Sequence, residues 1–138
     1  MKKLKKSIRC STDRAMKIIL DTHIFLWCLG EPEKIPKDKQ FEIETLSNIV
    51  YVSSVSIAEL MIKSSIGKLK VDYNPVEIAR ESGFELLDFA AEDALLLKNL
   101  PFHHKDPFDR MLIAQSLNKN IPIYTDDGKF RLYNCRLI

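Results

Sequence analysis

The segment His103–Arg110 is the most polar stretch of the chain, and it runs directly into apolar residues with helical spacing. Pro107 fits the first turn of that helix, where its missing N–H costs nothing, and Asp106 fits the N-cap position before it. Asp109 then lies in the first turn. These carboxylates could bind a cation, or they could only cap the helix and offset its dipole. Both interpretations of Asp106 stay open. For Asp109, acidic residues elsewhere in the chain favour cation binding over capping alone.

Acidic residues recur at three other places, each after a short apolar run that is typical of a buried parallel strand. They are Asp21, Glu59, and the pair Asp126 and Asp127. Taken singly, Asp21 could be an ordinary helix cap, and Glu59 could be a helix residue that faces solvent. The carboxyl ends of parallel strands, however, lie at one edge of a sheet, where open α/β folds bind their ligands. We therefore expect the four acidic sites to converge.

Several carboxylates in one cleft repel each other and take up protons unless a cation compensates them. No set of histidines and cysteines stands among these acids, so the ligands are hard oxygens, which suit Mg²⁺ or Mn²⁺ rather than zinc. One or two such ions can activate water and stabilise an in-line displacement at phosphorus. The acidic residues thus favour metal-dependent phosphoryl chemistry.

The two histidines in the polar segment, His103 and His104, suggest a different chemistry. Either could act as a general base, or could support a cyclising cleavage that needs no metal. We instead expect a loop role for both, with Lys105 or Arg110 contacting phosphate or pairing with the acids. Cleavage that persists in EDTA would favour the histidine mechanism.

Short apolar runs alternate with helical patterns along the whole chain, which is typical of a parallel sheet covered on both faces. Five strands are expected, at residues 17–20, 49–53, 84–87, 121–124 and 134–138. Helices are expected at 24–29, 37–48, 54–66, from Asn74, at 90–100, from Pro107, and briefly around Phe130. The sequence therefore predicts an α/β fold with a mostly five-stranded parallel sheet.

The composition bounds the class of protein. A chain of 138 residues, 46% hydrophobic and 29% charged, is expected to form one domain with its own core. No apolar run approaches the roughly 18 residues that a membrane-spanning helix needs. Cys10, Cys28 and Cys135 are widely spaced, odd in number and without a C-x-x-C pair, which is typical of free thiols in a reducing compartment. We therefore expect a cytoplasmic protein.

Residues 1–15 differ from the rest, with six basic residues against one acidic residue, a net charge of +5. Residues 16–138 then carry a net charge of −3, so the net charge gives no evidence of a broad basic face for nucleic acid on the core. The basic segment could touch phosphates, but we expect it to be a solvated, disordered N-terminal extension. The folded domain is then expected at residues 16–138.

Over about residues 16–138, these motifs resemble the PIN-domain nucleases of the VapC toxin type. The most specific part of the resemblance is Leu100–Gln115, which contains the His-Lys-Asp-Pro-Phe-Asp-Arg run at 104–110. The other matching motifs are Leu20–His23, Leu26 with Trp27, Ser53–Ser56 with Glu59 and Lys63, Gly67–Leu69, and Thr125–Asp127 with Phe130.

The resemblance implies a three-layer α/β/α sandwich and assigns the acidic site. Its catalytic, metal-binding set falls on Asp21, Glu59, Asp109 and Asp127, which would hold Mg²⁺ or Mn²⁺. Asp127 is chosen because the family pattern Thr-x-Asp-x-x-Phe matches Thr125, Asp127 and Phe130, and Asp126 is the runner-up. Residues that could orient the ligands or water from behind are Thr22, Thr125, Asp106, Asp126 and Arg110.

The resemblance also implies a function, a metal-dependent endoribonuclease that is the toxin of a toxin–antitoxin pair. Such a protein would cut RNA to leave a 5′-phosphate and a 3′-hydroxyl, form a homodimer, and be held inactive by a cognate antitoxin. Two alternatives stay open. The chain could be a non-catalytic PIN-fold module that binds RNA or protein, or another metal-dependent phosphoryl-transfer enzyme such as a DNA nuclease or a phosphatase.

Overall fold

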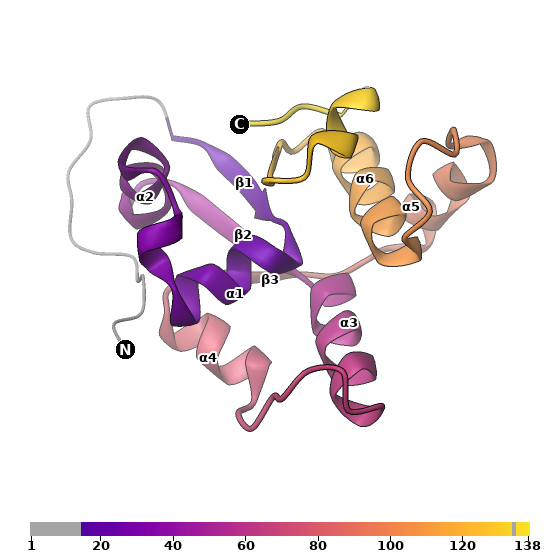
Figure 1. The fold of residues 1–138 in the computed structure, drawn as a ribbon. Coiled ribbons are helices and arrows are strands. Elements are labelled where there is room, and N and C mark those ends of the chain that lie inside the picture. The colour runs from indigo at the N-terminus through magenta and orange to yellow at the C-terminus, as the bar shows by residue number, and fades with distance from the viewer. Residues whose placement is uncertain (1–14, 134) are drawn as a thin grey trace.

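The computed structural model describes residues 15–133 and 135–138 of the chain (Figure 1). Cys10 and nearly all of the expected extension at 1–15 lie outside these residues, so that extension stays a prediction. Cys28 and Cys135 are buried free thiols, as their spacing predicts. Within the described residues, no helix is long and apolar enough to cross a membrane.

The sheet has four parallel strands in the order β3-β2-β1-β4. The strands are β1 (Lys17–Leu20), β2 (Ile49–Ser53), β3 (Glu85–Leu87) and β4 (Ile123–Tyr124). Successive side chains of a strand point to opposite faces, so Ile18 and Leu20 enter one apolar cluster while Ile19 enters another. Both faces are therefore covered, and the carboxyl ends of all four strands meet at one edge.

Helices form the outer layers on the two faces of the sheet (Figure 1). The helices α1 (Thr22–Gly30), α2 (Lys37–Glu44) and α4 (Pro75–Glu81) lie on one side, and α5 (Ala91–Leu95) and α6 (Pro107–Lys119) lie on the other. The helix α3 (Ser54–Ser65) starts directly at the end of β2. Short 3₁₀ turns occur at Pro32–Lys34, Leu96–Asn99 and Gly128–Leu132. The expected three-layer α/β/α sandwich is confirmed.

The sheet has four strands rather than the five that the sequence predicts. The last expected strand, at 134–138, contributes one isolated parallel bridge between Ile123 and Leu137. β4 is two residues long, and of these only Ile123 turns its N–H and C=O toward the terminal segment. Ile123 donates to Arg136 O at 2.9 Å and accepts the Ile138 N–H at 3.1 Å, so the described residues 135–138 pair with β4 at a single position. The helix expected at 90–100 is also shorter, since α5 gives way to a 3₁₀ turn at Leu96.

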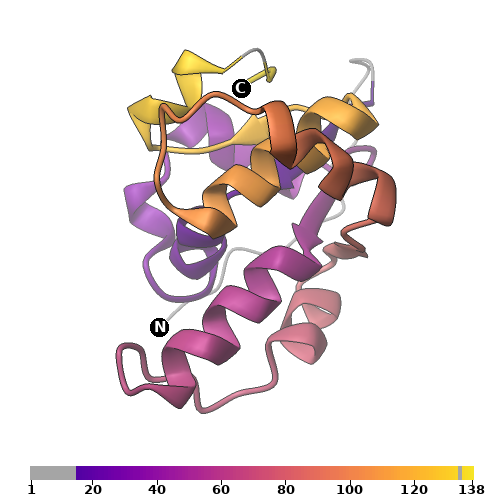
Figure 2. The same cartoon turned by 90° about the vertical axis from the view of Figure 1, so that its right-hand side faces the viewer.

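α5 lies beside α6, the helix that carries Asp109 (Figure 2), and a buried carboxylate joins the two. The fully buried Asp93 accepts hydrogen bonds from the Ala90 N–H at 2.8 Å and from Asn118 Nδ2 at 2.7 Å, and Lys119 Nζ lies 3.1 Å away. Burial by itself raises the pKa of Asp93, but these partners together hold it below its ordinary value. The ionised carboxylate therefore stabilises the contact between the two helices.

Replacing Asp93 by Ala should lower the free energy of unfolding at pH 7 by about 3 kcal/mol, because it removes the hydrogen bonds and the ion pair that the buried carboxylate makes with its partners. A carboxyl whose folded pKa is depressed stabilises the fold above its unfolded pKa, and this contribution is lost as the pH falls through the folded pKa. Urea titrations should therefore show the difference between wild type and variant shrinking below about pH 4. A difference that stays constant down to pH 2 would contradict this account.

Candidate active site

A polar cavity of about 290 Å³ opens at the edge where the strands end. All four acidic residues that the sequence singles out line it, and they come from four separate segments of the chain. The other polar side chains at its wall are Thr22, His23, Lys63, Asp106 and Asp126. The topology of the sheet thus does bring the predicted acids together.

Asp21 ends β1 and is buried, with 6% of its surface exposed. Its Oδ2 accepts a hydrogen bond of 2.7 Å from Thr125 Oγ1, and the same hydroxyl oxygen accepts the Asp127 N–H at 3.0 Å. Burial raises the pKa of Asp21, and the nearby Glu59 adds to this, against the hydrogen bond from Thr125. Thr125 thus links two of the acids, as a residue that orients ligands would. Thr22 instead donates to Ser56 Oγ at 2.7 Å, which ties the start of α1 to the start of α3.

Glu59 lies in α3 and is buried, with 6% exposed, which rules out the solvent-facing alternative. Its Oε2 pairs with Lys63 Nζ at 2.6 Å, one helical turn further on. Its Oε1 is buried and has no hydrogen-bond partner in the part of the chain that the structure describes. Buried polar atoms are nearly always satisfied, so an unpartnered carboxylate oxygen in the wall of a cavity indicates a missing ligand.

The start of α6 places Asp109 in the cavity. Asp106 is its N-cap, because its Oδ1 accepts the N–H groups of Phe108 at 2.9 Å and of Asp109 at 3.1 Å. The capping interpretation of Asp106 is therefore correct, and its carboxyl also lines the cavity. Burial, followed by the charges of Asp21, Asp106, Glu59 and Asp127, raises the pKa of Asp109 to about 8.

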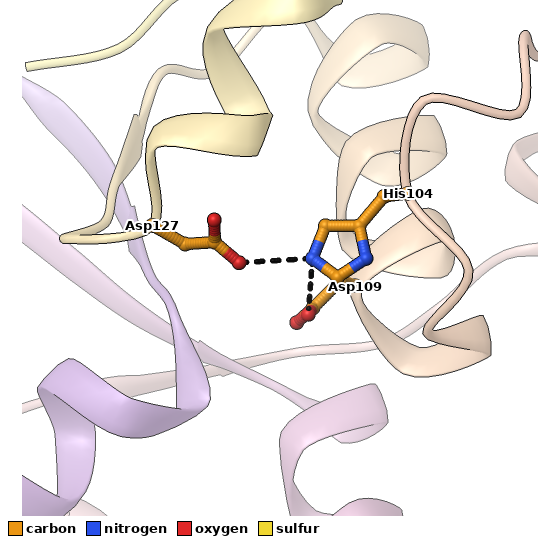
Figure 3. A group of neighbouring side chains, drawn as sticks. All are labelled: His104, Asp109 and Asp127. Atoms are coloured by element: carbon orange, nitrogen blue, oxygen red, sulfur yellow. Dashed lines mark hydrogen bonds and ion pairs between the residues drawn. The ribbon is translucent and has the colours of Figure 1, made fainter.

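The sequence did not predict that His104 would join the acids. Its Nε2 forms a 2.9 Å hydrogen bond with Asp127 Oδ2 and lies 2.9 Å from Asp109 Oδ2, as Figure 3 shows. Asp127 Oδ1 accepts the Lys129 N–H at 2.9 Å, and the bonds from Lys129 and His104 outweigh burial and lower the pKa of Asp127. A signal was present in the sequence, since His104 precedes the N-cap residue by two positions and so must lie near the start of α6.

Among the described residues Arg110 forms no ion pair with the acids, whereas the other expectation, contact with a phosphate, stays a prediction. Its buried guanidinium donates to two carbonyls of the preceding loop, Leu100 O at 3.0 Å and Pro101 O at 2.7 Å. Tyr133 completes this anchor, since its hydroxyl donates to Pro101 O at 2.7 Å and accepts the His104 N–H at 2.8 Å. Arg110 and Tyr133 thus fix the loop from which the His104 side chain enters the cavity.

The donor set fits a hard divalent cation. Six carboxylates line one cavity, one Glu59 oxygen is buried without a partner among the described residues, and burial together with the neighbouring negative charges disfavours ionisation of Asp109. A divalent ion would satisfy the orphaned oxygen and compensate the charge, and oxygen ligands are those that Mg²⁺ and Mn²⁺ prefer. Within the described residues, the tightest group of potential ligand atoms is that of His104, Asp109 and Asp127, all within 4.8 Å of one another.

Comparison with known proteins gives one family and a set of similar folds. The family model for the PIN domain matches residues 18–134. No curated protein sequence matches the chain. Among solved structures, VapBC2 from Rickettsia felis, bound to a DNA fragment from its promoter, has a TM-score of 0.69 at 18% identity and covers 89% of this chain and 98% of its own.

Two further structures have the same fold at similar identity. DNA-bound VapBC from Salmonella typhimurium has a TM-score of 0.64 at 17% identity and covers 89% of this chain and 97% of its own. VapBC-5 from Mycobacterium tuberculosis, a member of the VapBC family of toxin–antitoxin systems, has a TM-score of 0.55 at 18% identity, with coverages of 88% and 95%. At these identities the likeness establishes the fold alone.

Proposed function

Because this chain belongs to the PIN-domain family, we propose that it is a metal-dependent endoribonuclease and the toxin of a toxin–antitoxin pair. The observation that carries the proposal is the convergence of the four predicted acids on one cavity, with a buried Glu59 oxygen that has no partner among the described residues. Clustered carboxylates repel each other unless a cation compensates their charge. A cation held by carboxylates is suited to phosphoryl transfer.

In the proposed site, Asp21, Asp109 and Asp127 hold Mg²⁺ or Mn²⁺, and Glu59 adds its free Oε1 directly, through water, or to a second ion. When bound, such a cation supplies charge that stabilises the phosphoryl transition state and makes water a stronger nucleophile. Thr125 holds the carboxylate of Asp21 in place through its 2.7 Å hydrogen bond.

Lys63 has a role toward the substrate in this proposal. Its ammonium group lies at the cavity wall and is partly exposed, and the ion pair with Glu59 restricts its position. The hydrogen bond to Glu59, with the charges of Asp106 and Asp109, raises the pKa of Lys63, so this side chain stays positively charged. It can therefore meet a phosphate of the RNA while the acids face the cation.

We propose that a cognate antitoxin controls this site in the cytoplasm and that the toxin is a homodimer. The proposal of a partner is supported by the shared fold, since the similar structures are described as VapBC complexes. An acidic cavity favours a basic side chain of the partner by charge complementarity. A small protein encoded beside this chain should accordingly co-purify with it and inhibit cleavage.

The test is cleavage of a structured RNA pool by the purified protein, free of any partner, with Mg²⁺, with Mn²⁺ and with EDTA. A DNA pool of the same sequences is assayed at the same salt concentration, because affinity for a phosphate backbone falls steeply with salt. We expect RNA cleavage with either metal and none in EDTA, because without the cation the clustered carboxylates have no positive charge to offer the phosphate.

Other outcomes contradict the proposal in different ways. Cleavage in EDTA would indicate the metal-independent histidine mechanism. Equal cleavage of both pools would indicate a nuclease that does not select RNA. A folded protein that binds the metal and the RNA but cuts nothing would indicate the non-catalytic binding module.

A further inference from the structure

His104 is the least expected neighbour of the acids that line the cavity, and its side chain is held from three directions. Its backbone N–H donates to the Tyr133 hydroxyl, its Nδ1 accepts the Asp106 N–H at 3.2 Å, and its ring packs at 90° to the ring of Phe130. Only 7% of the residue is exposed. The direction in which Nε2 points is therefore fixed by the loop and the core rather than by the acids.

The hydrogen bonds of the ring also determine its tautomer. In a neutral imidazole one nitrogen carries the proton and the other accepts. Since Nδ1 accepts the Asp106 N–H, the ring proton is on Nε2, the nitrogen that faces Asp127 and Asp109 (Figure 3). Nε2 is then a donor toward the carboxylates. In this tautomer it has no lone pair with which to ligate a cation or to act as a general base.

We infer that His104 is a positioning residue: its Nε2–H holds the carboxylates of Asp127 and Asp109 in the arrangement that receives the cation. This inference rests on the proposed function. The inference goes beyond the proposed function because it gives His104 a contact with the carboxylates rather than with the metal or the substrate. The Nε2–H donates a 2.9 Å hydrogen bond to Asp127 Oδ2, which fixes that carboxylate, and it lies 2.9 Å from Asp109 Oδ2, so the same donor stands beside both acids.

Such a role predicts a loss of metal affinity when the donor is removed. Groups that orient metal ligands from behind typically change metal affinity by about 10- to 100-fold when they are mutated. Replacing His104 by Gln or by Asn tests the two ring nitrogens one at a time. In Gln the terminal NH₂ can reach the position of Nε2, whereas in Asn the amide oxygen can take the position of Nδ1 and the NH₂ stops at the position of ring carbon Cδ2, one bond short of Nε2.

The experiment measures Mn²⁺ binding directly, by electron paramagnetic resonance of free Mn²⁺, for wild type, His104→Gln, His104→Asn and Asp21→Asn. We expect His104→Gln to stay within about 3-fold of the wild-type Kd and His104→Asn to weaken binding by at least about 10-fold. Thermal melts in EDTA establish that each variant is folded. Should His104→Asn fail to fold, His104→Leu replaces it, since Leu has no donor.

The outcomes separate this inference from the proposed function. Wild-type binding that is unchanged in every His104 variant overturns the positioning role and leaves the nuclease proposal standing. Binding that the Asn variant retains and the Gln variant loses also overturns it, because His104 then acts only through the Asp106 N–H. If wild type binds no Mn²⁺, both the metal site and the role of His104 within it are wrong.

Discussion

Replacing Asp21 by Asn should lower RNA cleavage by at least about a thousand-fold and leave the fold intact. Asp21 is the most central candidate ligand, at the end of β1 in the middle of the sheet. Charge stabilisation by a bound cation is worth several kcal/mol, and about 4 kcal/mol corresponds to a thousand-fold in rate. An amide at this position keeps an oxygen for the Thr125 hydroxyl but removes the charge that a cation needs.

The stability of the variant provides an independent measurement. Because burial raises the pKa of Asp21, its ionised form is disfavoured in the metal-free protein, and a neutral amide should not destabilise that protein. We expect the melting temperature in EDTA to be equal to or above that of wild type. The rise in melting temperature that Mg²⁺ or Mn²⁺ produces in wild type should be absent in the variant. A ligand raises the stability of a folded protein only if that folded protein binds it.

Asp126→Asn is the matched control for this prediction. Asp126 lines the same cavity but is exposed to solvent, and its substitution by Asn removes the same charge. Its substitution should cost less than about 3-fold in activity. Equal losses in the two variants would mean that the total charge of the cavity matters rather than the ligand positions. If the Asp21→Asn variant keeps its activity, Asp21 is not a ligand of the catalytic cation.

The sequence predicts the acidic residues because strand order and residue type together determine where they lie. Asp21 and Asp127 follow buried apolar runs, and any parallel sheet brings the ends of such runs to one edge. Glu59 needs one step more, namely that its helix begins directly after β2. A charged residue in a helix usually faces solvent, so its burial becomes evident only from the packing of α3 across the end of the sheet.

The cationic and aromatic partners of the site are not predictable in the same way. His104 and Arg110 lie in a loop and at the start of a helix, and their partners Asp127 and Tyr133 are more than twenty positions away. No periodicity encodes such contacts, because a loop side chain can turn toward the acids or toward the carbonyls without changing the pattern. The missing fifth strand has the same cause, since pairing at the edge depends on the length of β4.

Replacing Arg110 by Lys should lower the free energy of unfolding by about 3 kcal/mol and reduce activity as well. The guanidinium reaches the carbonyls of Leu100 and Pro101 with two different nitrogens, and the exposed ring of Phe102 covers it at 4.1 Å. A lysine ammonium can satisfy one of these carbonyls at most. Each hydrogen bond to a charged group contributes about 1.5–3 kcal/mol, so the loss of one bond and of the ring contact gives this magnitude.

The same substitution decides between two roles for the positive charge. If Arg110 bound a phosphate of the substrate, Lys would keep the charge, and both urea stability and activity would change little. If it anchors the loop, stability falls and His104 loses its fixed approach to the acids, so Mn²⁺ binding weakens along with stability. Lys105→Ala is the control, because Lys105 is exposed in the same loop and its loss should leave stability within about 0.5 kcal/mol. If the Arg110→Lys protein is stable and binds Mn²⁺ with wild-type affinity, Arg110 contacts a phosphate of the substrate and does not anchor the loop.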